Sequence, residues 1–188
     1  KWLLEYDGLH PVDLIIANAG VTYSLTDSLS HEPLNVINDI IDTNLIGVIN
    51  TVTPLISLLE ERKRGHIAII SSLSAYRGVP TFPAYSASKT AIKCYFEAIR
   101  GRLKRHNINT TIVCPGYIKT PMTQQLKGIK LMTMNVDHAA SKIKKGIEQS
   151  RLTIIFPLPL AMSIWIINIL PAQINDWIYS LLFLKNRK

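Results

Sequence analysis

A tyrosine and a lysine stand four residues apart, at Tyr85 and Lys89, in a segment with helical periodicity. Residues at this spacing share one face of a helix, so the Lys89 ammonium can lie near the Tyr85 phenol. An unperturbed tyrosine has a pKa of about 10 and is a poor base at neutral pH, whereas a neighbouring cation favours the phenolate. Ser72, at the end of an expected strand, can offer a second hydroxyl to the same substrate oxygen. These residue types predict proton transfer at a carbonyl or alcohol oxygen.

Short apolar runs alternate with longer stretches of helical periodicity along the chain. Buried strands are expected at residues 13–17, 66–71, 109–114 and 152–156, and helices at residues 34–62, 85–105 and 137–149. Strands and helices that alternate in this way are typical of a parallel sheet covered by helices on both faces. We therefore predict an α/β protein. Its length of 188 residues and its 47% hydrophobic content suit one compact unit.

Other motifs accompany the tyrosine and lysine. They are Asn18-Ala19-Gly20 after the first expected strand, Asn44 in the long helix, Ser72, and Pro115-Gly116-Tyr117-Ile118-Lys119-Thr120 after the third strand. A lone Tyr-x-x-x-Lys is usually a surface helix pair, but five signatures in this order are specific. Over about residues 10 to 156, the sequence resembles the short-chain dehydrogenase/reductase family. The resemblance implies a Rossmann-like, doubly wound parallel sheet.

The resemblance also implies roles for individual residues. Tyr85 would exchange the proton, and Lys89 would lower its pKa and hydrogen-bond the nicotinamide ribose. Ser72 would steady the substrate oxygen, and the main chain at Asn44 would hold a water that connects Lys89 to solvent. The implied cofactor-binding residues are Asn18, Ala19, Gly20, Tyr85, Lys89, Pro115, Gly116, Ile118 and Thr120, of which Ile118 and Thr120 would meet the nicotinamide carboxamide.

The implied function is interconversion of a small-molecule carbonyl and a secondary alcohol, by hydride transfer with NAD or NADP as cofactor. The family begins with a strand and a glycine-rich turn for the cofactor pyrophosphate, and nothing before Asn18 supplies them. We therefore expect the sheet to lack its first strands and the chain to be part of a longer enzyme. Alone, it is expected not to bind a dinucleotide. The resemblance further implies a homodimer or tetramer built on helices 34–62 and 85–105.

Composition argues against several other functions. The net charge is +8, but the basic clusters fall at helix ends or on solvent-facing helix surfaces, without interleaved aromatic residues, so nucleic-acid binding is not expected. The five histidines are scattered without metal-ligand spacing, and no metal site is expected. Two cysteines, Cys94 and Cys114, indicate a reducing, cytoplasmic compartment and are expected to be small packing residues.

The last 32 residues form an apolar tail. We divide the chain into a partial Rossmann-fold catalytic domain, residues 1–156, and an apolar extension, residues 157–188, interrupted at Pro171. Neither half of the extension reaches the roughly 20 apolar residues that span a bilayer. Two interpretations remain: the tail packs over the substrate pocket or a partner subunit, or it lies peripherally in a membrane interface with its basic end, residues 185–188, on anionic lipid.

The tail also suggests a lipophilic substrate. Two other functions remain open at this point. One is a non-catalytic scaffold that keeps the fold, and the other is a membrane-surface protein whose tail carries its function.

Overall fold

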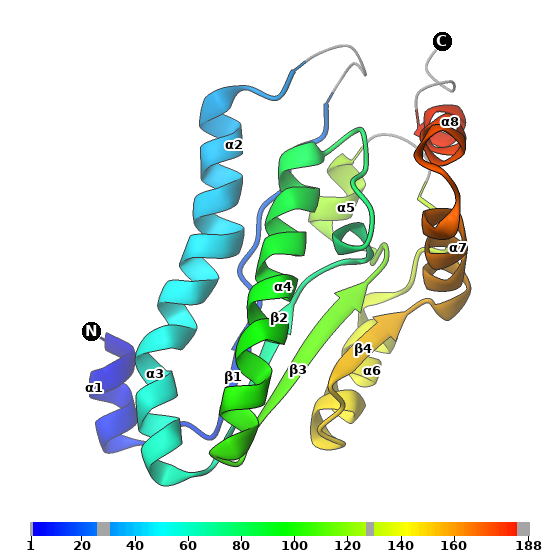
Figure 1. Ribbon diagram of the computed structural model, residues 1–188. Coiled ribbons are helices and arrows are strands. Elements are labelled where there is room, and N and C mark those ends of the chain that lie inside the picture. The colour runs from blue at the N-terminus through cyan, green and yellow to red at the C-terminus, as the bar shows by residue number, and fades with distance from the viewer. Residues whose placement is uncertain (1, 26–30, 127–129, 184–188) are drawn as a thin grey trace.

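A single four-stranded parallel sheet forms the centre of the molecule (Figure 1). The structure is a computed structural model, and it describes residues 2–25, 31–126 and 130–183. The strands lie in sequence order across the sheet as β1 (Leu14–Ala17), β2 (Gly65–Ile70), β3 (Ile108–Pro115) and β4 (Thr153–Phe156). Each pairs in parallel with the next, for example with Ile15 opposite Ile67. The predicted α/β class and parallel sheet are confirmed, with strand ends shifted by a single residue at most.

The predicted helices are also present. They are α2 (Leu34–Ile41), the π-helical turn η1 (Asp42–Gly47), α3 (Val48–Arg62), α4 (Pro83–Arg105) and α6 (Val136–Glu148). The helix predicted at residues 34–62 is continuous but widens at η1, and α4 begins two residues before the predicted start. Its first residue is Pro83, whose fixed backbone angle suits the first position of a helix.

Several elements were not predicted individually. They are α1 (Trp2–Leu9), the 3-10 turn η2 (Leu73–Ala75) and α5 (Pro121–Gln125). The apolar tail forms two helices, α7 (Leu158–Ile169) and α8 (Ala172–Phe183), separated at Pro171 as the sequence suggested. Only Leu170 and Pro171 lie between the two helices.

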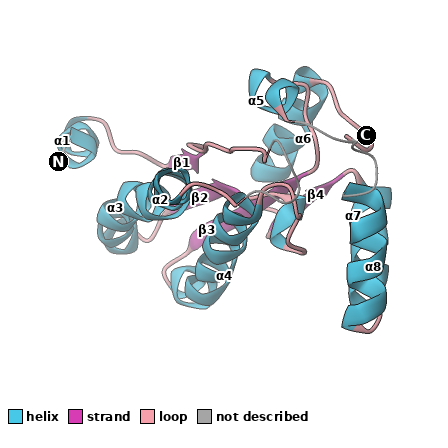
Figure 2. Ribbon diagram, turned by 90° about the horizontal axis from the view of Figure 1, so that it is seen from above, coloured by secondary structure: helices cyan, strands magenta, loops and turns pink. Residues whose placement is uncertain are grey.

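Helices cover both faces of the sheet (Figure 2). On one face α2, α3 and α4 lie side by side, and side chains such as Leu55, Leu59 and Phe96 are buried there against the strands. On the other face α6 packs against β3 and β4 around a smaller core. Gly146 permits this approach, because a Cβ atom there would lie 2.3 Å from Ile154 Cδ1. Because the four strands are parallel, their carboxyl ends lie at the same edge of the sheet.

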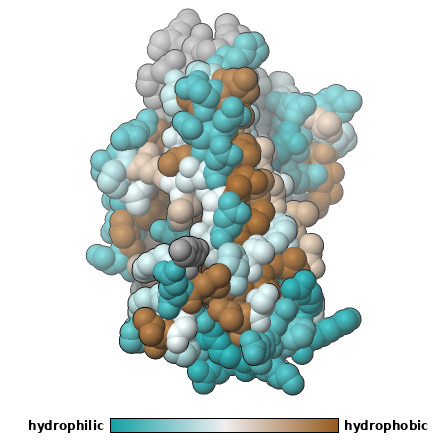
Figure 3. All heavy atoms as spheres, turned by 90° about the vertical axis from the view of Figure 1, so that its left-hand side faces the viewer, coloured by the Kyte–Doolittle hydropathy of each residue, from teal (hydrophilic) through white to brown (hydrophobic). Residues whose placement is uncertain are grey.

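The edge strand β1 exposes apolar side chains. Leu14 is 44% exposed and Ile16 is 49% exposed, on the opposite face of the strand from the buried Ile15 and Ala17. Figure 3 faces this side of the molecule and shows hydrophobic residues among the hydrophilic ones at the surface. Below β1, the buried Asp7 of α1 pairs with Arg62 of α3, which holds the pKa of that carboxyl below its usual value.

The helical stretch Leu34–Arg62 has the length and hydropathy of a membrane span. Its apolar side chains Val48, Val52 and Leu55 are nevertheless buried in the main core, against the sheet. We therefore interpret it as a core helix of the fold. The shorter apolar helix α7 falls below the length of a span, as predicted.

The two cysteines differ in environment. Cys114 is fully buried in β3, as predicted for a packing residue. Cys94 is exposed on α4, so the packing prediction for it is wrong. Its neighbours Ile92 and Phe96 turn toward the core, and a residue midway between two core-facing positions of a helix points outward.

Candidate active site

The predicted site residues gather at the carboxyl ends of the parallel strands. Gly20 follows β1, Ser72 follows β2, and Gly116 follows β3. In open α/β sheets this edge is where ligands bind, because the connecting segments leave a crevice there. Tyr85 and Lys89 reach the same edge from the first turns of α4. Asn18 and Ala19 lie at the end of β1 and are exposed.

Ser72 and Tyr85 meet directly. The Ser72 Oγ atom accepts a hydrogen bond from the Ser74 backbone N–H at 3.1 Å, which fixes the serine at the start of η2. The Ser72 hydroxyl also lies near the Tyr85 phenol. Burial raises the pKa of Tyr85, and the nearby Ser72 hydroxyl opposes the rise. The two hydroxyls therefore form one polar group at the edge of the sheet.

Lys89 lies over the ring of Tyr85, and its predicted effect on the pKa of the phenol stays a prediction. Its Nζ atom lies 5.6 Å from the centre of the Tyr85 ring and donates a hydrogen bond to the Ile70 carbonyl at 2.9 Å. The ammonium thus faces the ring and the end of β2, and the pKa of Tyr85 is raised by burial instead of being lowered by a cation. The predicted effect requires the ammonium closer to the phenol oxygen.

Lys89 is nearly inaccessible, with 3% of its surface exposed. Burial lowers the pKa of its ammonium to about 8, because the charged form loses hydration. An ammonium has three N–H donors, and the Ile70 carbonyl accepts one of them. Gly20 leaves space beside the others, since a Cβ atom there would lie 3.2 Å from Lys89 Nζ. The glycine of the Asn-Ala-Gly motif therefore lets the backbone lie close to this ammonium, where a larger residue would crowd it.

Asn44 is completely buried in the π-helical turn η1. Its Oδ1 atom accepts a hydrogen bond from the Val21 N–H at 2.7 Å, and its Nδ2 atom donates to the Val21 carbonyl at 2.9 Å. The same Nδ2 atom donates to Ser88 Oγ at 3.1 Å. The side chain therefore joins the segment after Gly20 to α4. The water-holding role predicted for its main chain stays a prediction.

The Pro115-Gly116 turn packs closely against Phe156 and Pro157, where the tail begins. The Gly116 N–H donates to the Phe156 carbonyl at 2.7 Å, and a Cβ atom on Gly116 would lie 2.9 Å from Pro157 Cδ. Further along, Thr120 accepts a hydrogen bond from the Thr123 N–H and caps α5. Ile118 pairs with Met134 in an isolated bridge. Thr120 thus has a structural task besides the predicted cofactor contact.

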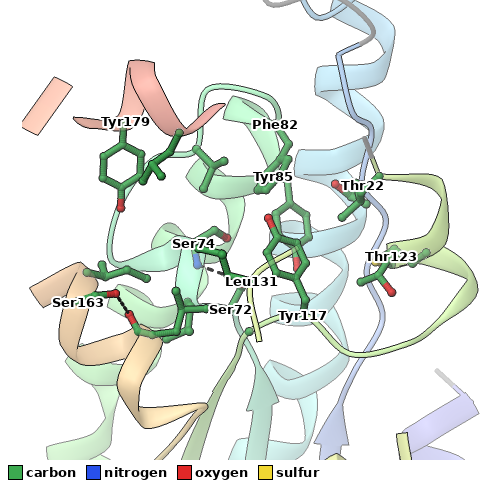
Figure 4. Close-up of a pocket in the computed structure, with 18 of the residues that line it drawn as sticks. Thr22, Ser72, Ser74, Phe82, Tyr85, Tyr117, Thr123, Leu131, Ser163 and Tyr179 are labelled. Carbon is green, nitrogen blue, oxygen red and sulfur yellow. Dashed lines mark hydrogen bonds between the residues drawn. The ribbon is translucent and has the colours of Figure 1, made fainter. Parts of the chain in front are cut away.

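A cavity of about 150 Å³ opens beside Ser72 and Tyr85 (Figure 4). Its lining is mostly apolar, and the described residues that form it include no Asp, Glu, Lys, Arg or His. The lining residues are Thr22, Ser72, Leu73, Ser74, Val79, Phe82, Tyr85, Gly116, Tyr117, Met122, Thr123, Leu126, Leu131, Leu160, Ser163, Ile164, Ile167, Tyr179 and Leu182. Both tail helices therefore form walls of the cavity that Ser72 and Tyr85 line.

The tail helices are held to the segment that follows η2. Arg77 pairs with Asp176 of α8, and its guanidinium lies 5.2 Å from the centre of the Tyr179 ring. Asn168 of α7 donates a hydrogen bond to the Tyr76 carbonyl at 2.8 Å. This packing supports the interpretation that the tail covers the pocket. The tail helices also expose apolar side chains, such as Ile166, Ile169 and Trp177. The basic residues 185–188, which the membrane interpretation requires, lie outside the described residues.

Sequence motifs alone missed most of this cavity. Tyr117 lies inside the Pro-Gly segment but carries no motif role, and Thr22 and Met122 lie outside every motif. A signal did exist in the tail, where Leu160, Ile164 and Ile167 recur at helical spacing. Among the described residues, no three His, Cys, Asp or Glu side chains come together in a way that could hold a metal ion.

Comparison with known proteins defines the class. Residues 6–129 match the family model described as short chain dehydrogenase, and the chain belongs to that family. It is 32% identical over 165 residues to an "Uncharacterized oxidoreductase" of Myxococcus xanthus, covering 88% of this chain and 64% of the relative. It is 37% identical over 112 residues to "Dehydrogenase/reductase SDR family member 7B" of Xenopus tropicalis, covering 60% of this chain and 36% of that relative. The chain thus spans less than two thirds of the length of either relative.

Solved structures show the same fold. A short chain dehydrogenase from Burkholderia cenocepacia, solved in complex with NADP, superposes with a TM-score of 0.74 at 22% identity, over 90% of this chain and 70% of that one. The apo form of LigD from a Sphingobium strain gives a TM-score of 0.68 at 24% identity, over 89% of this chain and 68% of that one. The Rossmann-like architecture predicted from the motifs is confirmed.

Proposed function

We propose that this chain forms the substrate side of the active site of an oxidoreductase that interconverts a lipophilic ketone and its secondary alcohol. The observation that carries the proposal is the pair of Ser72 and Tyr85 hydroxyls at the edge of a cavity whose described lining carries no charge, with Lys89 buried beside them. The family to which the chain belongs supports an oxidoreductase. NAD or NADP would supply or accept the hydride when bound.

The residues present suit a nicotinamide cofactor. Lys89 has N–H donors beyond the one that binds the Ile70 carbonyl, and Gly20 leaves space next to them. Ribose hydroxyls are suitable acceptors for such donors. We propose that the cofactor lies along the strand edge against the predicted residues, which are Asn18, Ala19, Gly20, Tyr85, Lys89, Pro115, Gly116, Ile118 and Thr120.

Tyr85 is suited to donate a proton. Because burial raises its pKa above 10, the phenol keeps its proton at neutral pH and can give it to a carbonyl oxygen that becomes an alkoxide. Ser72 can donate a second hydrogen bond to the same oxygen, since its own oxygen already accepts from Ser74. For the reverse reaction the phenol must first lose its proton, and a Lys89 ammonium brought closer by bound cofactor would favour this step.

The lining of the cavity supports an uncharged, lipophilic substrate. Leucine, isoleucine, valine, methionine and phenylalanine side chains form most of its walls. A charged group placed there would lose hydration without gaining an ionic partner, which is strongly unfavourable. The tail helices contribute to this apolar surface through residues such as Leu160 and Ile164.

The predicted homodimer or tetramer remains a proposal. The helices expected to pair, α3 and α4, lie on the same outer face of the sheet (Figure 2). Several small side chains on α4, including Ala87 and Cys94, are exposed and would allow close approach of a second helix. Family members typically assemble in this way.

The test is an activity assay with the full-length protein that contains this chain. We expect oxidation of NADH or NADPH with octan-3-one, and at least tenfold lower kcat/KM with the charged keto acid 7-oxooctanoate, because a carboxylate finds no cation in the cavity. If no lipophilic ketone supports cofactor oxidation, or if the keto acid is preferred, the proposed function is wrong.

A second prediction concerns the tail helices as a substrate wall. Arg77→Ala removes both the ion pair with Asp176 and the contact with the Tyr179 ring, so α8 is held less firmly. These two partly exposed contacts together are worth about 1 kcal/mol. We expect KM for octan-3-one to rise about fivefold with kcat nearly unchanged.

Arg64→Ala is the matched control, because it breaks an exposed ion pair with Asp13 at the opposite end of the sheet. Steady-state kinetics of both variants provide the comparison. Equal KM values for the Arg77 variant and the unmodified enzyme would show that α8 does not depend on this contact.

A further inference from the structure

Tyr117 brings a third hydroxyl group to the site. It follows Gly116 directly and lines the same cavity as Ser72 and Tyr85. The turn that carries it is fixed on both sides, because the Gly116 N–H donates to the Phe156 carbonyl at 2.7 Å and the Met134 N–H donates to the Tyr117 carbonyl at 2.9 Å. Figure 4 shows the Tyr117 side chain in the cavity, near Tyr85.

The Tyr117 phenol has no hydrogen bond to any of the residues that the structure describes. Tyr117 is only partly buried, and its oxygen is not one of the buried atoms that lack a partner, so the hydroxyl is open to the cavity and can donate to a ligand. Burial, followed by the neighbouring Tyr85, raises the pKa of Tyr117 to about 12. The group therefore remains a hydrogen-bond donor throughout the physiological pH range.

The reacting oxygen does not need this donor. A carbonyl oxygen has two lone pairs, and the hydroxyls of Ser72 and Tyr85 suffice to occupy both. A third hydroxyl beside them is therefore left for a different acceptor. We propose that Tyr117 is a specificity-determining residue that binds a second oxygen of the substrate, on a carbon close to the reacting carbonyl.

The chemistry of the cavity restricts this second oxygen further. Among the residues that the structure describes, no Lys, Arg or His lines the cavity, so none of them would balance a carboxylate or a phosphate. The second oxygen thus belongs to a neutral group such as a hydroxyl. The inferred substrate class is a lipophilic hydroxyketone, or the corresponding diol in the opposite direction. The inference rests on the proposed function, because it takes this cavity as the substrate site.

The experiment measures ligand binding and needs no turnover. Three probes with one carbon skeleton are titrated calorimetrically into the full-length protein: octan-3-one, 2-hydroxyoctan-3-one and 1-hydroxyoctan-3-one. A net hydrogen bond of ordinary strength corresponds to roughly a fivefold to tenfold difference in affinity. We expect at least one hydroxyketone to bind tighter than octan-3-one by this factor.

Tyr117→Phe removes the hydroxyl and keeps the ring, so the fold and the apolar walls remain. In this variant we expect the hydroxyketone to lose its advantage, with octan-3-one binding unchanged. Tyr179→Phe makes the same chemical change on the α8 wall of the cavity, away from the Ser72 and Tyr85 pair (Figure 4), and should preserve the preference.

The proposal is overturned if the unmodified protein shows no preference or binds none of the probes, if Tyr117→Phe keeps the preference, or if Tyr179→Phe abolishes it equally. Failure of the proposed function looks different. In that case no probe is turned over with NAD(P)H, while a preference that depends on Tyr117 can still be measured by binding.

Discussion

Tyr85→Phe abolishes turnover in the full-length enzyme while cofactor affinity changes little. The substitution removes one oxygen and keeps the ring, so the packing of the ring against Phe82 is retained. What is lost is the proton donor, and proton transfer by a positioned side chain contributes about 100-fold to 10,000-fold in rate. Tyr117 does not replace it, because Ser72 and Lys89 lie beside Tyr85. We expect kcat to fall by at least roughly 100-fold.

The measurement combines steady-state kinetics with a calorimetric titration of the cofactor. Tyr95→Phe is the matched control, since Tyr95 lies on the same helix but packs against the core of the fold. It should keep nearly full activity. Retention of more than a few per cent of kcat in the Tyr85 variant would mean that another group donates the proton.

The pattern of apolar residues was sufficient to predict the sheet and its main helices. A strand that helices cover on both faces has apolar residues on both faces, so it appears in the sequence as a continuous apolar run. Ile67 to Ile69 form such a run, and these residues are fully buried. The motifs added the spatial order, because the residues that follow parallel strands must meet at one edge. Ser72, Tyr85 and Lys89 therefore come together as predicted, although the sequence alone could not place the Lys89 ammonium relative to the phenol oxygen.

The walls of the cavity were much harder to predict. They come from segments far apart in sequence, such as Thr22 after β1 and Leu160 in α7, and only the packing of α7 and α8 brings them together. The apolar tail could equally have covered a partner or entered a membrane interface. What distinguishes these outcomes is local: Arg77 and the Tyr76 carbonyl offer partners to Asp176 and Asn168. Pairwise contacts of this kind leave no periodic signal in the sequence.

Lys89→Met separates the catalytic value of the buried ammonium from its effect on stability. Methionine has a similar length and no charge, so the space beside Gly20 stays filled. We expect kcat to fall by roughly 100-fold or more and cofactor affinity to fall with it, because the same N–H donors serve the ribose and the proton path. If only the pH optimum moved and cofactor affinity stayed the same, the proposed ribose contact would be wrong.

Although Lys89→Met is expected to lower activity, it should not lower the free energy of unfolding at neutral pH. Burial lowers the pKa of Lys89 from 10.5 to about 8, so the folded protein binds this proton more weakly than the unfolded chain does. Below pH 8 the charged amine therefore destabilises the fold, by roughly 3 kcal/mol for such a shift. Between pH 8 and 10.5 only the unfolded chain keeps the proton, so the free energy of unfolding rises with pH through this window.

Chemical denaturation of the chain at pH 7, 8, 9 and 10 measures this contribution. We expect Lys89→Met to be at least as stable as the unmodified protein at pH 7 and to lose the rise above pH 8. Lys93→Met is the control, because Lys93 lies one turn further along α4 in an ion pair with Glu97 at the protein surface. It should leave the rise intact. A large loss of stability in Lys89→Met at pH 7 would show that the hydrogen bond to the Ile70 carbonyl outweighs the cost of burying the charge, and that the ammonium is held for stability as well as for chemistry.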